Sequence, residues 1–109
     1  MDGNDVNVVV LMGRLSAPPQ ISRNDNTVVR LLIAAKSDAP TKRLDLLPVV
    51  WWNPTSDELG RIPPVGSRVT VTGSIQRRYW EGRDGRRSRI ELIAEQVAFP
   101  TDEARSETP

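Results

Sequence analysis

The chain has 109 residues, of which 38% are hydrophobic, and a formal net charge of +1, which fits one compact domain. It contains no cysteine and no histidine, which excludes disulfides, the usual zinc ligands and nucleophiles activated by histidine. No apolar run approaches the roughly 20 residues that cross a bilayer, and the polar start at residues 1–7 is unlike a signal peptide. We therefore expect a cytoplasmic protein with no membrane segment, metal or cofactor.

The small net charge conceals an uneven distribution. Residues 61–89 hold eight arginines against two acidic residues, whereas residues 90–109 hold one arginine against five acidic residues. A local excess of positive charge of this size is typical of a surface that binds a polyanion. A solvated hairpin on a protein of another function would carry the same charge, so the charge alone leaves both interpretations open.

The first strand is predicted at residues 7–15, a run of valine, leucine and methionine that is apolar on both faces. This pattern suits a strand covered on both sides, inside a barrel or at a subunit interface. Ser-Ala-Pro-Pro at residues 16–19 ends it. The second strand is predicted at residues 27–36, where alternation places Arg30 and Lys36 on the outer face.

The third strand is predicted at residues 44–52, after a polar loop that carries Arg43. Pro48 interrupts it, and because proline cannot donate to a ladder this predicts a sheet edge or a bulge. Trp51 and Trp52 are adjacent on a strand and so point to opposite faces. We assign Trp51 to the core and Trp52 to the outer face, although a flattened core or a dimer interface would bury both.

A short helical turn is predicted at residues 53–60, where the following prolines prevent its extension. The clearest strand covers residues 68–80, and Asp-Gly at residues 84–85 is a strong hairpin signal before the returning strand at residues 86–99. Five strands with a helical turn between the third and fourth give the order of an all-β, five-stranded OB-fold barrel with a long final hairpin. Five-stranded meanders and SH3-like barrels share most of this pattern.

We therefore expect one OB-fold domain over residues 1–99. The remaining residues, 100–109, are polar, acidic and proline-terminated, which predicts a disordered tail.

The final hairpin carries the constellation most suggestive of function. Counted from a turn at residues 84–85, its register places Tyr79 and Ile90 on the inward face. The outer face then carries a tryptophan among basic side chains: Trp80, Arg78, Arg87 and Arg89. Such a ring can stack on a base while guanidinium groups contact phosphates, and neither contact reads sequence. Alternatively, Trp80 lies flat under Arg89 and Arg78 as a cation–π lid on the barrel.

Basic residues of the earlier strands extend this surface into a groove. The full predicted nucleic-acid-binding set is Trp52, Trp80, Arg78, Arg87, Arg89, Arg30, Lys36 and Arg43.

Two blocks of the sequence are distinctive: Asn-Val-Val-Val-Leu-Met-Gly-Arg-Leu at residues 7–15 followed by Pro18, and residues 66–80 with the basic hairpin that follows. Together these blocks resemble bacterial single-stranded DNA-binding proteins. The resemblance covers roughly residues 6–99. It implies an OB fold, single-stranded DNA binding in replication, repair or recombination, and a homotetramer built as a dimer of dimers.

The resemblance also assigns roles by position. Trp52 and Trp80 match aromatic residues that stack on bases in the family, and the hairpin arginines fall on its binding hairpin. The first strand pairs across the family's dimer, which implies an interface at Val8, Val10 and Met12. Leu46 stands where the family often has an aromatic residue, and the family's long tail with its acidic, Phe-tipped end is missing. We therefore expect a short paralogue, in which recruitment of partners through that tail is in doubt.

Sequence-independent binding of single-stranded DNA at the nucleoid is thus the leading expectation. The alternative is an OB-fold adaptor that binds proteins and has weak or lost DNA binding. An RNA binder of the cold-shock type is a third possibility. An enzyme is the least favoured class, because the sequence offers no convergent catalytic set.

Overall fold

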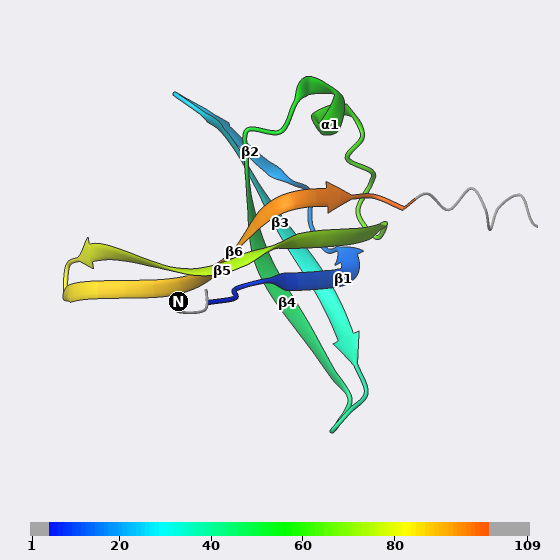
Figure 1. Cartoon of the computed structure of the whole chain (residues 1–109), viewed down its shortest axis with the longest axis horizontal. Coiled ribbons are helices and arrows are strands. Elements are labelled where there is room, and N and C mark those ends of the chain that lie inside the picture. The colour runs from blue at the N-terminus through cyan, green and yellow to red at the C-terminus, as the bar shows by residue number, and fades with distance from the viewer. Residues whose placement is uncertain (1–4, 101–109) are drawn as a thin grey trace, which may run out of the picture.

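The computed structural model describes residues 5–100, which form six β-strands and one short helix (Figure 1). In chain order these are β1 (Val9–Leu15), β2 (Gln20–Arg23), β3 (Thr27–Ser37), β4 (Arg43–Trp52), α1 (Ser56–Gly60), β5 (Arg68–Gly82) and β6 (Gly85–Ala98).

Five of the strands close into a ring in the order β1-β5-β6-β4-β3. All neighbours are antiparallel except β4 and β6, which run parallel from the pair Val49–Leu92 onward. The ring closes where β3 returns to β1 at Leu15–Ile33. This arrangement confirms the predicted OB barrel. The sequence analysis missed β2, which lies outside the ring on β3, because its four residues are exposed and show no alternation.

The core lies inside the ring. Every second residue along each strand points its side chain into it. Ten residues form it: Leu15, Val29, Leu31, Ile33, Val49, Trp51, Val69, Val71, Leu92 and Ala94. Trp51 is 4% exposed and meets Phe99 at a distance of 6.3 Å between ring centroids. The assignment of Trp51 to the core is therefore confirmed.

A bulge in β6 keeps both Ala94 and Val97 on the core side of the strand. Thr72 pairs with Gln96 but Gly73 pairs with Ala94, so the extra residue on β6 is Glu95. The extra residue reverses the alternation, and Val97 therefore packs against the core like Ala94. A side chain at Gly73 would collide with the carbonyl oxygen of Ile93, so the close approach of the two strands requires glycine here.

The β5–β6 hairpin projects beyond the ring as a long arm, seen at the left of Figure 1, and its register differs from the prediction. The strands close at Gly82–Gly85, so the two turn residues are Arg83 and Asp84, one position earlier than predicted. Gly85 has φ +114°, a conformation that glycine adopts without strain. The shift moves every pairing by two residues, and each side chain therefore keeps its predicted face.

Two residues predicted to point inward are nevertheless exposed. Tyr79 is 54% exposed and Ile90 51% exposed, although they lie on the face of the arm that continues the core face. The prediction that they are interior is wrong because the arm runs past the end of the barrel. Arg86 covers part of this face, with its guanidinium carbon 4.5 Å from the centroid of the Tyr79 ring.

Pro48 lies in a regular part of the sheet. It pairs with Leu32 without a register shift, so the predicted bulge is wrong. The pairing of β4 with β6 begins only at Val49, which leaves Pro48 on an edge segment where its missing N–H costs no ladder bond. The edge interpretation is therefore confirmed.

The predicted helical turn begins three residues later than expected. Asn53, with φ 52°, ends the β3–β4 ladder by accepting a hydrogen bond from the backbone N–H of Thr27 at 3.0 Å. Thr55 then caps α1, and Glu58 completes a capping box with it. No helix among residues 5–100 is long and apolar enough to cross a membrane. The predicted disordered tail lies outside the described residues, apart from Pro100.

Candidate nucleic-acid interface

The outer face of the β3–β4–β6–β5 sheet brings together most of the predicted site residues. Trp52 stands at one end, opposite Val28 on β3, with 51% of its surface exposed. Trp80 stands on the β5–β6 arm with 40% exposed. Ala94, the partner of Trp51, and Arg87, the partner of Trp80, are seven positions apart on β6, which places the two tryptophans of the outer face roughly 20 Å apart along the sheet.

Arginine side chains surround Trp80 as the sequence predicted. Arg87 lies directly opposite it on β6. Arg78 and Arg89 form a cross-strand pair on the same face, two residues closer to the barrel. The guanidinium carbon of Arg89 is 5.6 Å from the centroid of the Trp80 ring. This contact is the cation–π arrangement that the sequence analysis gave as an alternative, but the ring keeps enough exposed surface to stack on a base.

A buried carboxylate, which the sequence analysis missed, organises the middle of this face. Glu91 is 6% exposed and is the only buried charged residue among residues 5–100. Its Oε2 lies 3.7 Å from Arg30, 3.9 Å from Arg78 and 3.9 Å from Arg89. We call these three residues the arginine cluster. They come from β3, β5 and β6, and the pairing of β4 with β6 brings Arg30 to the two arginines of the hairpin.

A pocket of about 220 Å³ lies beside the cluster. Its apolar part includes Leu32, Pro48 and Val50, and its polar part comprises Gln20, Arg30, Arg89 and Glu91. Val50 alternates with the buried Val49 and Trp51 and so lies on the outer face of β4, but it is only 3% exposed. An apolar floor with guanidinium groups at its rim suits a flat ring joined to an anionic group.

Two of the predicted cations are engaged by acidic neighbours. Arg43 donates two hydrogen bonds to Asp45, at 3.0 and 2.7 Å, and these bonds hold the pKa of the Asp45 carboxyl below its ordinary value. The same bonds raise the pKa of Arg43. Arg87 donates a 3.0 Å hydrogen bond to Asp84 at the tip of the arm. Each pair has no net charge, so these arginines attract phosphate less than the arginine cluster does.

Lys36 does not join the arginine cluster. It lines a separate pocket of about 450 Å³ between β1 and the β3–β4 hairpin, together with Arg14, Arg68, Met12 and Leu44. Arg14 also donates a 2.9 Å hydrogen bond to the carbonyl oxygen of Gly66. Arg14 and Arg68 are cations that the sequence analysis did not select, and they are neighbours because β1 and β5 pair at these positions.

The first strand presents both an apolar face and an open edge. Val8, Val10 and Met12 are 66%, 62% and 62% exposed. Within the described residues, β1 pairs with β3 only at Arg14 and Leu15, so its second edge over residues 9–13 has no strand beside it. An apolar strand with a free edge is a template for pairing with another chain.

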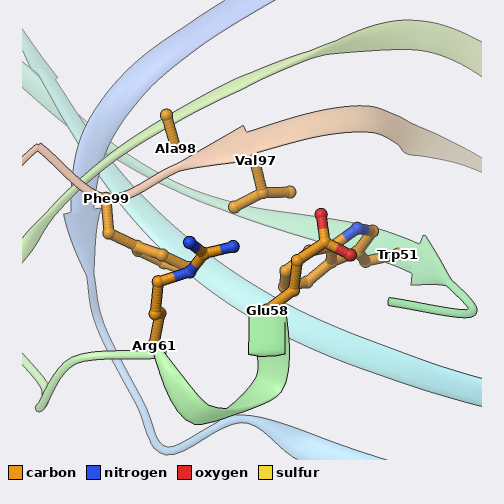
Figure 2. Close-up of a pocket in the computed structure, with 6 residues that line it drawn as sticks. All are labelled: Trp51, Glu58, Arg61, Val97, Ala98 and Phe99. Carbon is orange, nitrogen blue, oxygen red and sulfur yellow. The ribbon is translucent and has the colours of Figure 1, made fainter. Parts of the chain in front are cut away.

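A third pocket, of about 350 Å³, lies at the α1 end of the barrel (Figure 2). Trp51, Val97 and Phe99 form its apolar wall, while Glu58 and Arg61 reach it from α1 and the residue that follows. Glu58 already accepts a 2.7 Å hydrogen bond from the backbone N–H of Thr55. The residues 5–100 contain no group of three or more metal-binding acidic side chains. The outer face therefore remains the best supported site.

Comparisons with known proteins find a matching family, curated relatives and a solved structure. The model of the "Single-strand binding protein family" matches residues 6–100. A "Single-stranded DNA-binding protein" of Clostridium tetani is 30% identical in an alignment of 101 positions that covers 86% of this chain and 70% of that protein. A protein of the same description from Caldanaerobacter subterraneus is 30% identical in an alignment of 104 positions that covers 86% of this chain and 67% of that protein.

A solved structure shares the fold. It is described as "Plasmodium falciparum SSB complex with ssDNA" and superposes with a TM-score of 0.76, covering 93% of this chain and 100% of that chain at 22% identity.

Proposed function

The chain belongs to the single-strand binding protein family, and on this basis we propose that its domain binds single-stranded DNA without reading the sequence and without catalysing a reaction. One observation carries the proposal: two exposed tryptophans stand on one outer face on either side of the arginine cluster. In this proposal the domain spans residues 1–99, as the sequence predicts.

In this proposal the aromatic rings contact the bases and the arginines contact the phosphates. Trp52 and Trp80 stack on bases, and each stacked base contributes about 1–3 kcal/mol whatever its identity. The arginine cluster contacts phosphates, which positions the strand but carries no sequence information. The spacing of roughly 20 Å between the platforms suits a strand of several nucleotides, within the range of about 4–16 per OB fold.

Such a protein protects single strands that arise in replication, repair or recombination. In a bacterial cell that work is done at the nucleoid, in the cytoplasm. The proposed groove includes Arg30 and the outer face of the arm, whereas Arg43 and Lys36 contribute less because one is neutralised and the other lies in a separate pocket.

Intrinsic fluorescence tests the proposal directly, because two of the three tryptophans are exposed on the proposed surface. Titration with oligo(dT) should quench the emission, and raising the salt should weaken binding with a slope of about −0.7 per phosphate neutralised. Binding that leaves the emission unchanged and ignores salt would overturn the proposal. Competition with oligo(U) separates this function from RNA binding.

We also propose that the domain assembles into a homo-oligomer through β1. The support is the apolar face at Val8, Val10 and Met12 beside the free edge at residues 9–13. Antiparallel pairing of two such edges would continue the sheet across a dimer, and two dimers could then pack through the same apolar face.

A second candidate function, a protein adaptor, is favoured by one observation. The core-side face of the arm exposes Ile75, Tyr79 and Ile90, which DNA binding on the opposite face leaves unused. The variants Trp80→Ala and Tyr79→Ala separate the two functions, because their side chains lie on opposite faces of the arm. Loss of oligo(dT) binding by Trp80→Ala alone supports the first, whereas a wild type that does not bind oligo(dT) supports the adaptor.

A further inference from the structure

Glu91 is an unusual residue for the centre of a surface that binds an anion. Its charge is buried, and a buried charge is normally paired. The distances of 3.7–3.9 Å to the arginine cluster are too long for hydrogen bonds, so the carboxylate acts through its charge and not through directed bonds. Its role therefore concerns the electrostatics of the cluster.

One carboxylate faces three guanidinium groups. It reduces their mutual repulsion and allows three cations to share a small area. The arginine side chains are 44%, 55% and 56% exposed, so N–H groups remain available to an anion from solvent. A phosphate in contact with these N–H groups would come close enough to the carboxylate for the two negative charges to repel each other.

We propose that Glu91 is an internal anion that limits how tightly the arginine cluster holds a phosphate of single-stranded DNA. The inference rests on the proposed function and adds a regulatory residue to it. Because Glu91 lies on β6 and its side chain is enclosed, the carboxylate cannot move away when the strand arrives. It offsets the repulsion among the three arginines in the free protein and weakens the phosphate contact in the complex, which favours release of the strand.

The opposite effect would follow if Glu91 mainly oriented the arginines. Two observations argue against this. Arg89 is also held by the Trp80 ring, at 5.6 Å, and Arg78 is its cross-strand partner. Arg30 is held on β3 opposite the buried Val50. The arginines therefore stay over the same face without the carboxylate, and the removal of its charge dominates.

The test compares Glu91→Gln with Glu95→Gln, which makes the same charge change at an exposed position on the same strand. Fluorescence anisotropy with labelled oligo(dT) measures affinity over a series of salt concentrations. We expect Glu91→Gln to bind roughly three- to tenfold more tightly than the wild type at low salt, with a gain that shrinks as salt screens the repulsion. The Glu95→Gln control should change affinity less than about twofold.

Two outcomes separate this inference from the proposed function. Failure of the wild type to bind oligo(dT) overturns the proposed function. Binding by the wild type, with Glu91→Gln equal to or weaker than Glu95→Gln, overturns only the role of Glu91.

A second comparison covers the case in which three unscreened arginines prevent folding. Arg30→Gln combined with Glu91→Gln leaves two cations and no carboxylate, and it should bind about three- to tenfold more tightly than Arg30→Gln alone. Equal affinities of these two variants would overturn the inference. Thermal unfolding without DNA gives an independent measure, since Glu91→Gln should lower Tm more than Glu95→Gln, and added sulfate should restore part of the loss. Equal Tm values would also count against it.

Discussion

The guanidinium group of Arg89 lies over the ring of Trp80, with 5.6 Å between its central carbon and the ring centroid. The contact ties a cation that can meet a phosphate to a ring that can stack on a base. It also covers part of a tryptophan that keeps 40% of its surface exposed. The arm therefore presents a pre-arranged pair of groups, and a strand that binds it need order fewer side chains.

Trp80→Ala should weaken binding of oligo(dT) by roughly 5- to 150-fold, which corresponds to the loss of one stacked base at about 1–3 kcal/mol. The fold should remain intact, because the ring lies on the arm and outside the core. Fluorescence anisotropy measures the affinity and circular dichroism checks the fold. Tyr79→Ala is the matched control, since Tyr79 is the neighbouring residue on the opposite face of the arm. Equal losses from the two variants would contradict the assignment.

Arg43→Ala should change DNA affinity less than about twofold, because Asp45 already neutralises this arginine. Asp45→Asn should free it, and Arg43→Ala made in that background should then weaken binding at low salt. A double-mutant cycle with anisotropy as the measurement gives the coupling. A large loss from Arg43→Ala in the wild type would show that the arginine leaves Asp45 to bind DNA.

The same pair has a defined pH dependence. The pKa of Asp45 lies below its ordinary value of 3.8 because Arg43 donates hydrogen bonds to the ionised carboxylate. The pair is therefore complete above pH 3.8 and is lost as the pH falls through the lower value in the folded state. NMR titration of the Asp45 side chain should give a midpoint below that of the same residue in Arg43→Ala. Identical midpoints would mean that the bidentate pair does not persist in solution.

Gly73→Ala should destabilise the domain strongly, by about 1–3 kcal/mol or more, because a Cβ at this position collides with the backbone of Ile93. Gly60→Ala provides the control: a Cβ there meets nothing within 4 Å, and stability should stay within about 0.5 kcal/mol. Urea unfolding followed by tryptophan emission measures both. Similar stability of the two variants would exclude the close strand approach at the bulge.

Met12→Glu should dissociate the proposed oligomer into monomers, because it places a charge on the exposed apolar face of β1. Ile21→Glu makes the same change on β2, where the side chain is 44% exposed and lies away from β1, and should leave the assembly unchanged. Light scattering after size-exclusion chromatography gives the mass of each species. A wild type that is monomeric at high concentration would rule out this interface.

Local pattern was enough to predict the parts of the molecule that depend on alternation. The opposite orientations of Trp51 and Trp52 follow from their adjacency on one strand, and the outer face of the arm survives a misplaced turn because the register error is two residues. Burial of Tyr79 was predicted wrongly, because alternation identifies a face but not where the barrel ends.

Most of the contacts that the sequence analysis missed depend on pairing between strands that are far apart in the sequence. Glu91 looks like an ordinary exposed residue of a charged strand until β4 and β6 pair and bring Arg30 over from β3. Arg14 and Arg68 lie 54 positions apart and meet only because β1 pairs with β5. The neutralisation of Arg43, in contrast, was readable from its spacing to Asp45 on one face of a strand, and that signal was overlooked.

The β5–β6 arm extends past the ring, so its length is uncoupled from the core. Removing two residues from each strand of the arm would shorten it while every remaining side chain kept its face, and no core residue would be disturbed. Odd changes in one strand would instead turn arginines and tryptophan to the wrong side. The length of the arm, and with it the stretch of nucleic acid that it contacts, can thus change in steps of two residues per strand while the barrel stays the same.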